Sequence, residues 1–221
     1  MSRQLARLLQ LASPTLPVGA YCYSQGLEWA VESGAVTNEA SALAWISDLL
    51  QWNMGRFEAP LLAQMMTACA AQDGEHLAQL NAHYLASRET AELRAETLQM
   101  AYSLLRLLDE LSLDVALVRQ IDNPTFPTVW AGVAVYWEIE IDDALSAYLW
   151  AWTENQTMAA LKSVPLGQAA GQRILAAMGQ RIAPVAQRAR AMDVADYSNF
   201  APGFAIACSR HETQYTRLFR S

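Results

Sequence analysis

Apolar residues recur every three or four positions along most of the chain, the spacing that places them on one face of an α-helix. The spacing runs from Glu75 through Leu111, with a break expected near Ser87. It also appears earlier, at Leu43, Ile46, Leu49, Leu50 and Met54. Because no segment shows the strict alternation of a half-buried strand, we predict an all-α protein. Residues 1–221 are expected to form one single-domain, multi-helix bundle.

Capping and helix-breaking residues predict where several helices begin and end. Thr37 and Asp142 are suited to cap the N-termini of the helices that follow them. Gly55 is expected to kink or end the first of these helices. Gly167 and Gly171 lie four positions apart, so on a helix they would form a small face that admits a close neighbour.

The segment Val129–Trp137 is apolar apart from Gly132, and its periodicity fits a buried strand and a buried helix equally well. We predict a helix, because helical patterns flank the segment and no partner strand is apparent. The segment is far shorter than the roughly 20 residues of a membrane-spanning helix, so we expect no membrane span.

Composition narrows the function classes. The formal net charge is −7 and Lys162 is the only lysine, so the chain has no basic footprint for nucleic acid or an anionic membrane. Hydrophobic residues make up 53% of the sequence, which suggests surface reserved for other subunits. The N-terminal residues lack a secretory core and cleavage site, so we expect a cytoplasmic protein. Cys22, Cys69 and Cys208 are expected to be reduced thiols.

A proline-rich connector, Ser13–Trp29, interrupts the helical pattern near the N-terminus. Pro14 and Pro17 fix φ and lack an N–H, which excludes a regular helix around them. Helical spacing returns from Gln25 to Glu32. Gly19 can then adopt a left-handed turn. We expect a stiff segment that delivers Tyr21 and Tyr23 to a defined place; an ordinary interhelical loop with buried tyrosines is the alternative.

Motifs for catalysis or tight cofactor binding are scarce. Ser24 and Gly26 match part of a nucleophile elbow, but Cys22 occupies its first glycine position and no strand precedes it. A Walker A loop is absent. Cys208 and His211 form a Cys-x-x-His pair that offers two ligands to a transition metal, although a local network in the tail is the simpler interpretation. We predict that the protein is not an enzyme.

The last stretch of the chain loses clean helical periodicity from Tyr197 onward. It carries arginines and aromatic residues, the types that dominate protein–protein hot spots. They are Arg210, Tyr215, Arg217, Phe219 and Arg220. We predict a partner-binding C-terminal tail over residues 199–221, and packing of the tail on its own chain is the alternative.

Three stretches, in order along the chain, resemble the urease accessory protein UreF family. They are LPVGAYCYSQGLEW from Leu16 to Trp29, LKSVPLGQAAGQRIL from Leu161 to Leu175, and SRHETQYTRLFRS from Ser209 to Ser221. The chain departs from the family pattern at Cys22, where the family more often has serine, and over residues 203–208.

The resemblance implies a non-catalytic urease maturation chaperone with an all-helical fold, homodimeric within a larger complex. Its partners would be a UreD-type (also called UreH-type) accessory protein, a UreG-type GTPase and apo-urease. The chain itself would bind no cofactor tightly, because GTP belongs to the partner GTPase and nickel is handled by the whole complex.

The resemblance also implies partner-binding residues. Lys162 is a contact for the GTPase, and Tyr21 is a contact at the junction with the next accessory subunit. The full set is Tyr21, Tyr23, Glu28, Lys162, Arg210, His211, Tyr215, Arg217, Phe219 and Arg220.

Two alternatives remain for the mechanism. In one, a C-terminal arginine such as Arg210 or Arg217 activates the partner GTPase as an arginine finger. In the other, the chain is a metallochaperone that binds nickel directly through Cys208 and His211.

Overall fold

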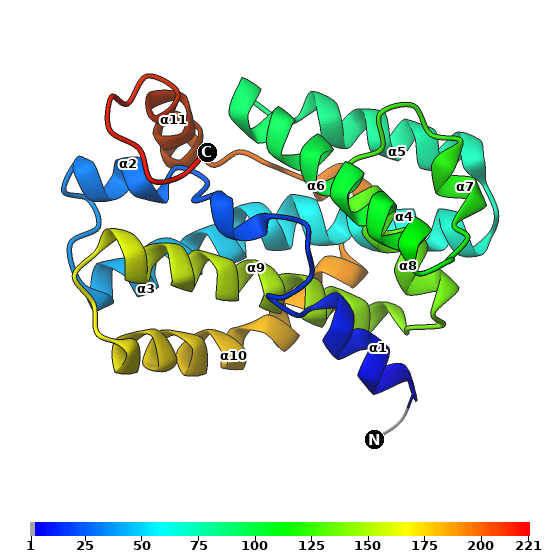
Figure 1. Ribbon diagram of the computed structural model, residues 1–221, viewed down its shortest axis with the longest axis horizontal. Helices are drawn as coiled ribbons and strands as arrows, with labels where there is room; N and C mark the ends of the chain where they lie inside the picture. The colour runs from blue at the N-terminus through cyan, green and yellow to red at the C-terminus, as the bar shows by residue number, and fades with distance from the viewer. Residues whose placement is uncertain (1–2) are drawn as a thin grey trace.

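Helices occupy most of the chain in the computed structural model, which describes residues 3–221 (Figure 1). The α-helices are α1 (Arg3–Leu11), α2 (Leu27–Glu32), α3 (Glu39–Leu49), α4 (Ala59–Ala70), α5 (Gly74–Ala86), α6 (Ala91–Glu110), α7 (Ala116–Arg119), α8 (Phe126–Tyr136), α9 (Ile141–Ser163), α10 (Gln168–Ala191) and α11 (Pro202–His211). Three short segments, η1 (Ala20–Cys22), η2 (Leu50–Glu58) and η3 (Val194–Asp196), complete the set. Residues 3–221 contain no strand, which confirms the all-α prediction.

The hydrophobic core is continuous from α1 to α10. Figure 1 shows α9 and α10 side by side, and α8 lies against α4 and α6. The helix predicted over Val129–Trp137 is confirmed as α8, and its Trp130 is only 1% exposed. The Trp130 ring meets Phe126 and Tyr148 edge to face, with ring centroids 5.9 Å and 5.3 Å apart. A helix that is apolar all round is therefore placed at the centre of the bundle.

Two predicted caps are displaced by one or two residues. Asn38, not Thr37, caps α3, because the Asn38 side chain accepts from the Ser41 amide at 3.0 Å while the Ser41 hydroxyl accepts from the Asn38 amide. This reciprocal capping box satisfies two donors together. Asp142 lies inside the first turn of α9, where it pairs with Arg190 at 2.5 Å.

The helix that begins with α3 does not end at Gly55. It widens into the π-helical segment η2 and continues into α4. Gly55 serves close packing: a Cβ there would lie 2.6 Å from Val185 Cγ1 on α10. Pro60 cannot donate a backbone hydrogen bond, and the Arg56 carbonyl accepts instead from the Ser198 amide at 3.0 Å.

The two glycines of the predicted small face have different roles. Gly167 precedes α10 as its N-cap, and a Cβ there would meet no atom within 4 Å. Gly171 lies within α10, and a Cβ there would approach Leu161 Cδ1 to 2.7 Å. Only Gly171 therefore admits a close neighbour, the end of α9.

The two chain segments that the sequence marks as unusual lie together. The connector follows α1, turns left-handed at Gly19 (φ +76°) as predicted, and passes through η1 to α2. The last segment crosses back from α10 to α11 and ends beside α2 and the connector (Figure 1). The end of the chain thus packs on its own N-terminal region.

Across residues 3–221, every helix is too short or too polar to cross a lipid bilayer.

Candidate functional site

The connector and the C-terminal segment are joined by backbone hydrogen bonds. The Ser24 and Gln25 amides donate to the Ser221 main-chain oxygen at 2.7 Å and 3.0 Å, and the Arg220 amide donates to the Cys22 carbonyl at 2.8 Å. The Ser24 hydroxyl also donates to the Ser221 oxygen, at 2.6 Å. We call residues 19–28 and 211–221 together the connector–tail junction.

The start of α2 is shaped for this contact. Gln25 and Gly26 both have positive φ, +52° and +76°. A Cβ at Gly26 would lie 2.9 Å from the Cys208 backbone nitrogen on α11, so glycine meets both a conformational and a steric requirement. Phe204 and Cys208 of α11 also pack with Leu49 and Leu93 in a small apolar cluster.

Glu28, in the first turn of α2, binds the returning chain. Its carboxylate accepts from the Leu218 amide at 2.6 Å and the Phe219 amide at 3.0 Å. The same carboxylate lies 3.2 Å from His211 Nε2. Glu28 is almost fully buried, so its charge is compensated by these donors and not by water.

His211 is fully buried between two carboxylates. Its Nδ1 lies 2.7 Å from Glu92, and Arg217 reaches the other Glu92 oxygen at 2.6 Å. Since each ring nitrogen already faces a carboxylate, neither points to free space. The Cys208 thiol is also buried, which raises its pKa and favours the thiol over the thiolate. Nickel binding by this pair would require the junction to open.

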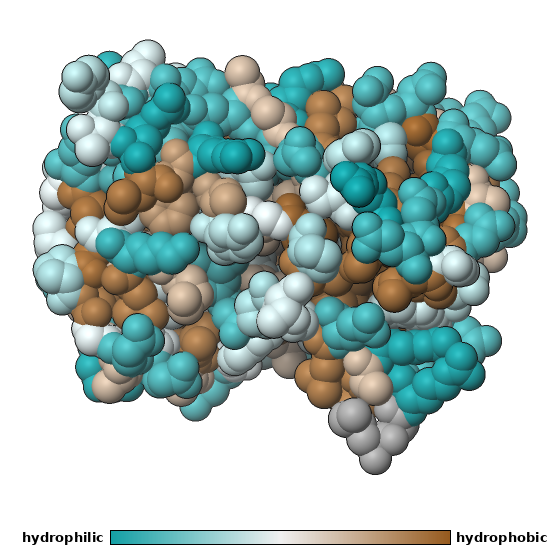
Figure 2. Space-filling model, in the orientation of Figure 1, coloured by the Kyte–Doolittle hydropathy of each residue, from teal (hydrophilic) through white to brown (hydrophobic). Residues whose placement is uncertain are grey.

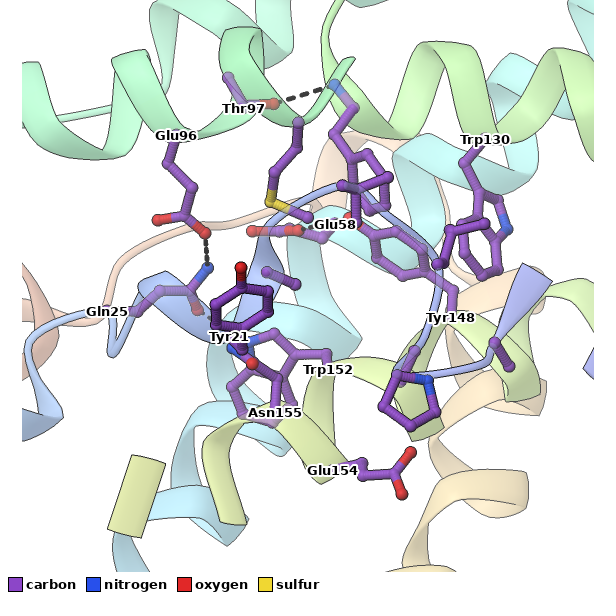
Figure 3. A pocket seen from close by; sticks show the side chains of 18 of the residues that line it. Tyr21, Gln25, Glu58, Glu96, Thr97, Trp130, Tyr148, Trp152, Glu154 and Asn155 are labelled. Carbon is purple, nitrogen blue, oxygen red and sulfur yellow. Dashed lines mark hydrogen bonds between the residues drawn. The ribbon is translucent and has the colours of Figure 1, made fainter. Parts of the chain in front are cut away.

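A cavity of about 190 Å³ lies beneath the connector, between α6, α8 and α9. On one wall Gln25 donates to Glu96 at 2.7 Å and accepts from the Trp152 indole at 2.8 Å (Figure 3). The Ser221 hydroxyl donates to the second Glu96 oxygen at 2.8 Å. Gln25 therefore belongs to both the cavity wall and the junction, and Glu96 of the wall is bonded to both segments of the junction.

A second polar group forms the inner wall of the cavity. Glu58, at the end of η2, pairs with Arg88 at 2.8 Å and accepts from the Tyr148 hydroxyl at 3.1 Å. The Arg88 guanidinium lies 4.3 Å from the Tyr84 ring centroid. Burial raises the pKa of both tyrosines, so they remain hydrogen-bond donors at neutral pH.

Lys162 lies near the cavity mouth, where α9 ends. Its ammonium is 5.8 Å from the centroid of the Tyr21 ring and 5.4 Å from that of Phe219, so it bridges connector and tail. Tyr21 is 63% exposed while Phe219 is buried. The structure thus brings together three residues that lie far apart in the sequence.

Comparison with known proteins identifies the family. The sequence model of the UreF family matches residues 36–179. The chain is 60% identical to the urease accessory protein UreF of Dechloromonas aromatica, covering 99% of this chain and 98% of that protein. It is 58% identical to the UreF protein of an Azoarcus species, covering 98% and 95%, and 53% identical to that of Methylobacillus flagellatus, covering 100% and 99%.

This chain belongs to the UreF family. The resemblance seen in three short stretches is therefore confirmed over nearly the whole sequence. These UreF relatives are urease accessory proteins.

Among the residues predicted to bind partners in this UreF chain, some are exposed and others are internal. Tyr21, Lys162, Arg210, Tyr215, Arg217 and Arg220 are exposed. Tyr23, Glu28, His211 and Phe219 are buried and hold the junction together. Arg217 is paired with Glu92, so an arginine-finger role would first require that pair to break, whereas Arg210 has no ion pair within residues 3–221.

Sequence reasoning missed Glu58, Arg88 and Glu96. A hint was present, since Glu96 falls on the apolar stripe that holds Leu93 and Met100, where a carboxyl group needs a specific partner. Within residues 3–221 no three or more His, Cys, Asp or Glu side chains gather in a metal-binding arrangement.

Proposed function

We propose that this UreF protein is a non-catalytic scaffold for urease maturation and that the connector–tail junction docks its protein partners. Those partners are a UreD-type accessory protein and a UreG-type GTPase, which together act on apo-urease. The protein works in the cytoplasm as a homodimer within the complex. GTP is bound by the GTPase, and nickel is cargo that the complex passes on.

One observation carries this proposal: the exposed Lys162 lies over both the exposed Tyr21 ring of the connector and the buried Phe219 ring of the tail. An exposed lysine against one aromatic ring gains little stability, about 0.5–1 kcal/mol. Nevertheless three separate segments are held by hydrogen bonds to present this surface. An exposed aromatic and cationic surface that is fixed in this way is typical of a binding site, where such side chains dominate affinity.

The surrounding surface supports a protein partner. Met158 and Leu218, with 44% and 70% exposure, add apolar area to that of Tyr21. Figure 2 shows further hydrophobic side chains gathered between hydrophilic ones on the face drawn. A mixed surface of this kind suits an interface with an apolar centre and a charged rim.

Size-exclusion chromatography with light scattering tests the proposal, using the full chain mixed with purified UreD-type and UreG-type proteins. The wild type is expected to form a stoichiometric complex. Lys162→Ala and Tyr21→Ala are expected to weaken it at least tenfold, a loss of about 1.4 kcal/mol.

Arg188→Ala is the matched control, because it removes an exposed cation on α10 that makes no ion pair within residues 3–221. A wild type that forms no complex would refute the scaffold function. Equal binding by the wild type and the three variants would show that the docking surface lies elsewhere on the molecule.

A further inference from the structure

Glu96 is a buried carboxyl group between the connector and the tail. Its side chain accepts from Gln25 at 2.7 Å and from the Ser221 hydroxyl at 2.8 Å, and the residue is 6% exposed. None of the ion pairs among residues 3–221 includes it. Its charge would therefore be held by two neutral donors alone.

The groups that face Glu96 do not supply the missing cation. Glu58 of η2 raises the pKa of Glu96, whereas Arg88, in the loop before α6, lowers it. These two residues already form an ion pair with each other. The other titratable neighbours have pKa values raised by burial and stay uncharged near neutral pH: Tyr23 of the connector, Tyr84 of α5 and Cys208 of α11.

Burial consequently raises the pKa of Glu96 to about 7, against an ordinary value of 4.5. The hydrogen bonds from Ser221 and Gln25 only partly offset this effect. While the junction is closed, the carboxyl group therefore loses its proton near neutral pH. Once water reaches it, it loses its proton near its ordinary pKa.

We propose that Glu96 is a proton-sensitive latch: its protonated form keeps the connector and the tail joined, and loss of the proton favours opening of the junction. Gln25 and Ser221 separate together, because the same carboxyl group holds both. The cavity beside Glu96 provides the space through which water reaches the carboxylate. The consequence for partner docking rests on the proposed function, whereas the latch itself is a property of the isolated chain.

Hydrogen exchange of the isolated full chain at pH 6 and pH 8 tests the latch. The reporters are the Ser24 and Gln25 amides, which donate to the Ser221 oxygen. After correction for intrinsic exchange, their protection is expected to be about tenfold lower at pH 8 than at pH 6. This factor follows by linkage from the different pKa values of Glu96 in the closed and open states.

Glu96→Gln imitates the protonated carboxyl group and is expected to remove this tenfold dependence. Glu154→Gln is the matched control: Glu154 lines the same cavity but makes no hydrogen bond to the tail among the described residues, so the dependence should persist. A wild-type dependence that survives in Glu96→Gln would overturn the latch.

Carbon-13 titration of the Glu96 carboxyl group in the wild type keeps the test independent of whether the variant folds. A midpoint near 7 supports the latch, and a midpoint below 5 overturns it. If exchange shows the tenfold dependence while no partner binds at either pH, the latch stands and the docking function fails. If partners bind but exchange is flat, docking stands and the latch fails.

Discussion

The bundle core and the connector–tail junction both contain buried carboxylates, but the two regions compensate them differently. In the core Glu58 has a cationic partner, Arg88, and a tyrosine donor. At the junction Glu28 is bound by two backbone amides and His211, and Glu96 by an amide and a hydroxyl group. Backbone and hydroxyl donors are readily replaced by water, whereas a buried ion pair is not. We therefore expect the junction to open more readily than the core.

The largest expected effect comes from breaking the core pair. Arg88→Met leaves the Glu58 carboxylate buried without its cation and should lower the free energy of unfolding by about 3–5 kcal/mol. Urea denaturation measures this loss. The double variant Glu58→Gln with Arg88→Met should recover part of it, because no charge is left unpaired. A single variant within 1 kcal/mol of the wild type would contradict the account.

The next effect is the pH dependence of stability at the junction. The pKa of Glu96 is raised on folding from 4.5 to about 7, so the native state binds the proton more tightly. The contribution of this protonated carboxyl group to the free energy of unfolding is fully present below pH 4.5. It is lost as the pH rises through about 7, by up to about 3 kcal/mol. Urea midpoints at pH 5 and pH 8 measure the change. Glu96→Gln should lose this contribution and be more stable than the wild type at pH 8.

A smaller global effect is expected at Glu28. Glu28→Gln weakens the hydrogen bonds to the Leu218 and Phe219 amides and should cost about 1–2 kcal/mol, because a hydrogen bond to a charged group contributes about 1.5–3 kcal/mol and one between neutral groups about 0.5–1.5 kcal/mol. Hydrogen exchange should show the loss confined to residues 211–221. Glu32→Gln, one turn further along α2 and exposed, is the matched control and should leave exchange unchanged. A loss spread evenly over the helices would show that the junction and core unfold together.

The smallest effect on stability belongs to the exposed surface. Lys162→Ala removes only the contacts with the Tyr21 and Phe219 rings and should cost less than about 1 kcal/mol. Thermal unfolding measures it. A larger loss would place Lys162 among the residues that hold the fold and not among those that dock partners.

The helices were predictable because their apolar spacing is a local property of the sequence. The break near Ser87 follows directly from that spacing. For the buried helix α8 the spacing left strand and helix open, and the helical patterns on both sides of the segment decided the prediction. The continuation of α3 through η2 into α4 was not predictable, because Gly55 indicates a kink or an end locally and a proline such as Pro60 is normally tolerated only in the first turn of a helix. Their tolerance depends on Val185 and Ser198, which are more than 100 residues away.

The candidate site was predictable only in part. Tyr21, Lys162 and Phe219 could be singled out as partner contacts on the basis of the family resemblance and of the aromatic residues in the tail, and the structure brings them together. The polar network behind them could not be predicted, since Glu28 and Glu96 find their partners in the last residues of the chain. No periodic pattern records a contact across so long a separation.

Partner binding by Glu28→Gln tests most directly the claim that the joined tail forms the docking surface. The variant, the wild type and Glu32→Gln would be titrated with the purified UreD-type and UreG-type proteins, with helix content followed by circular dichroism. Glu28→Gln alone is expected to dock at least tenfold more weakly, with its helix content unchanged. Undiminished docking, with hydrogen exchange showing that the tail has been released, would contradict it.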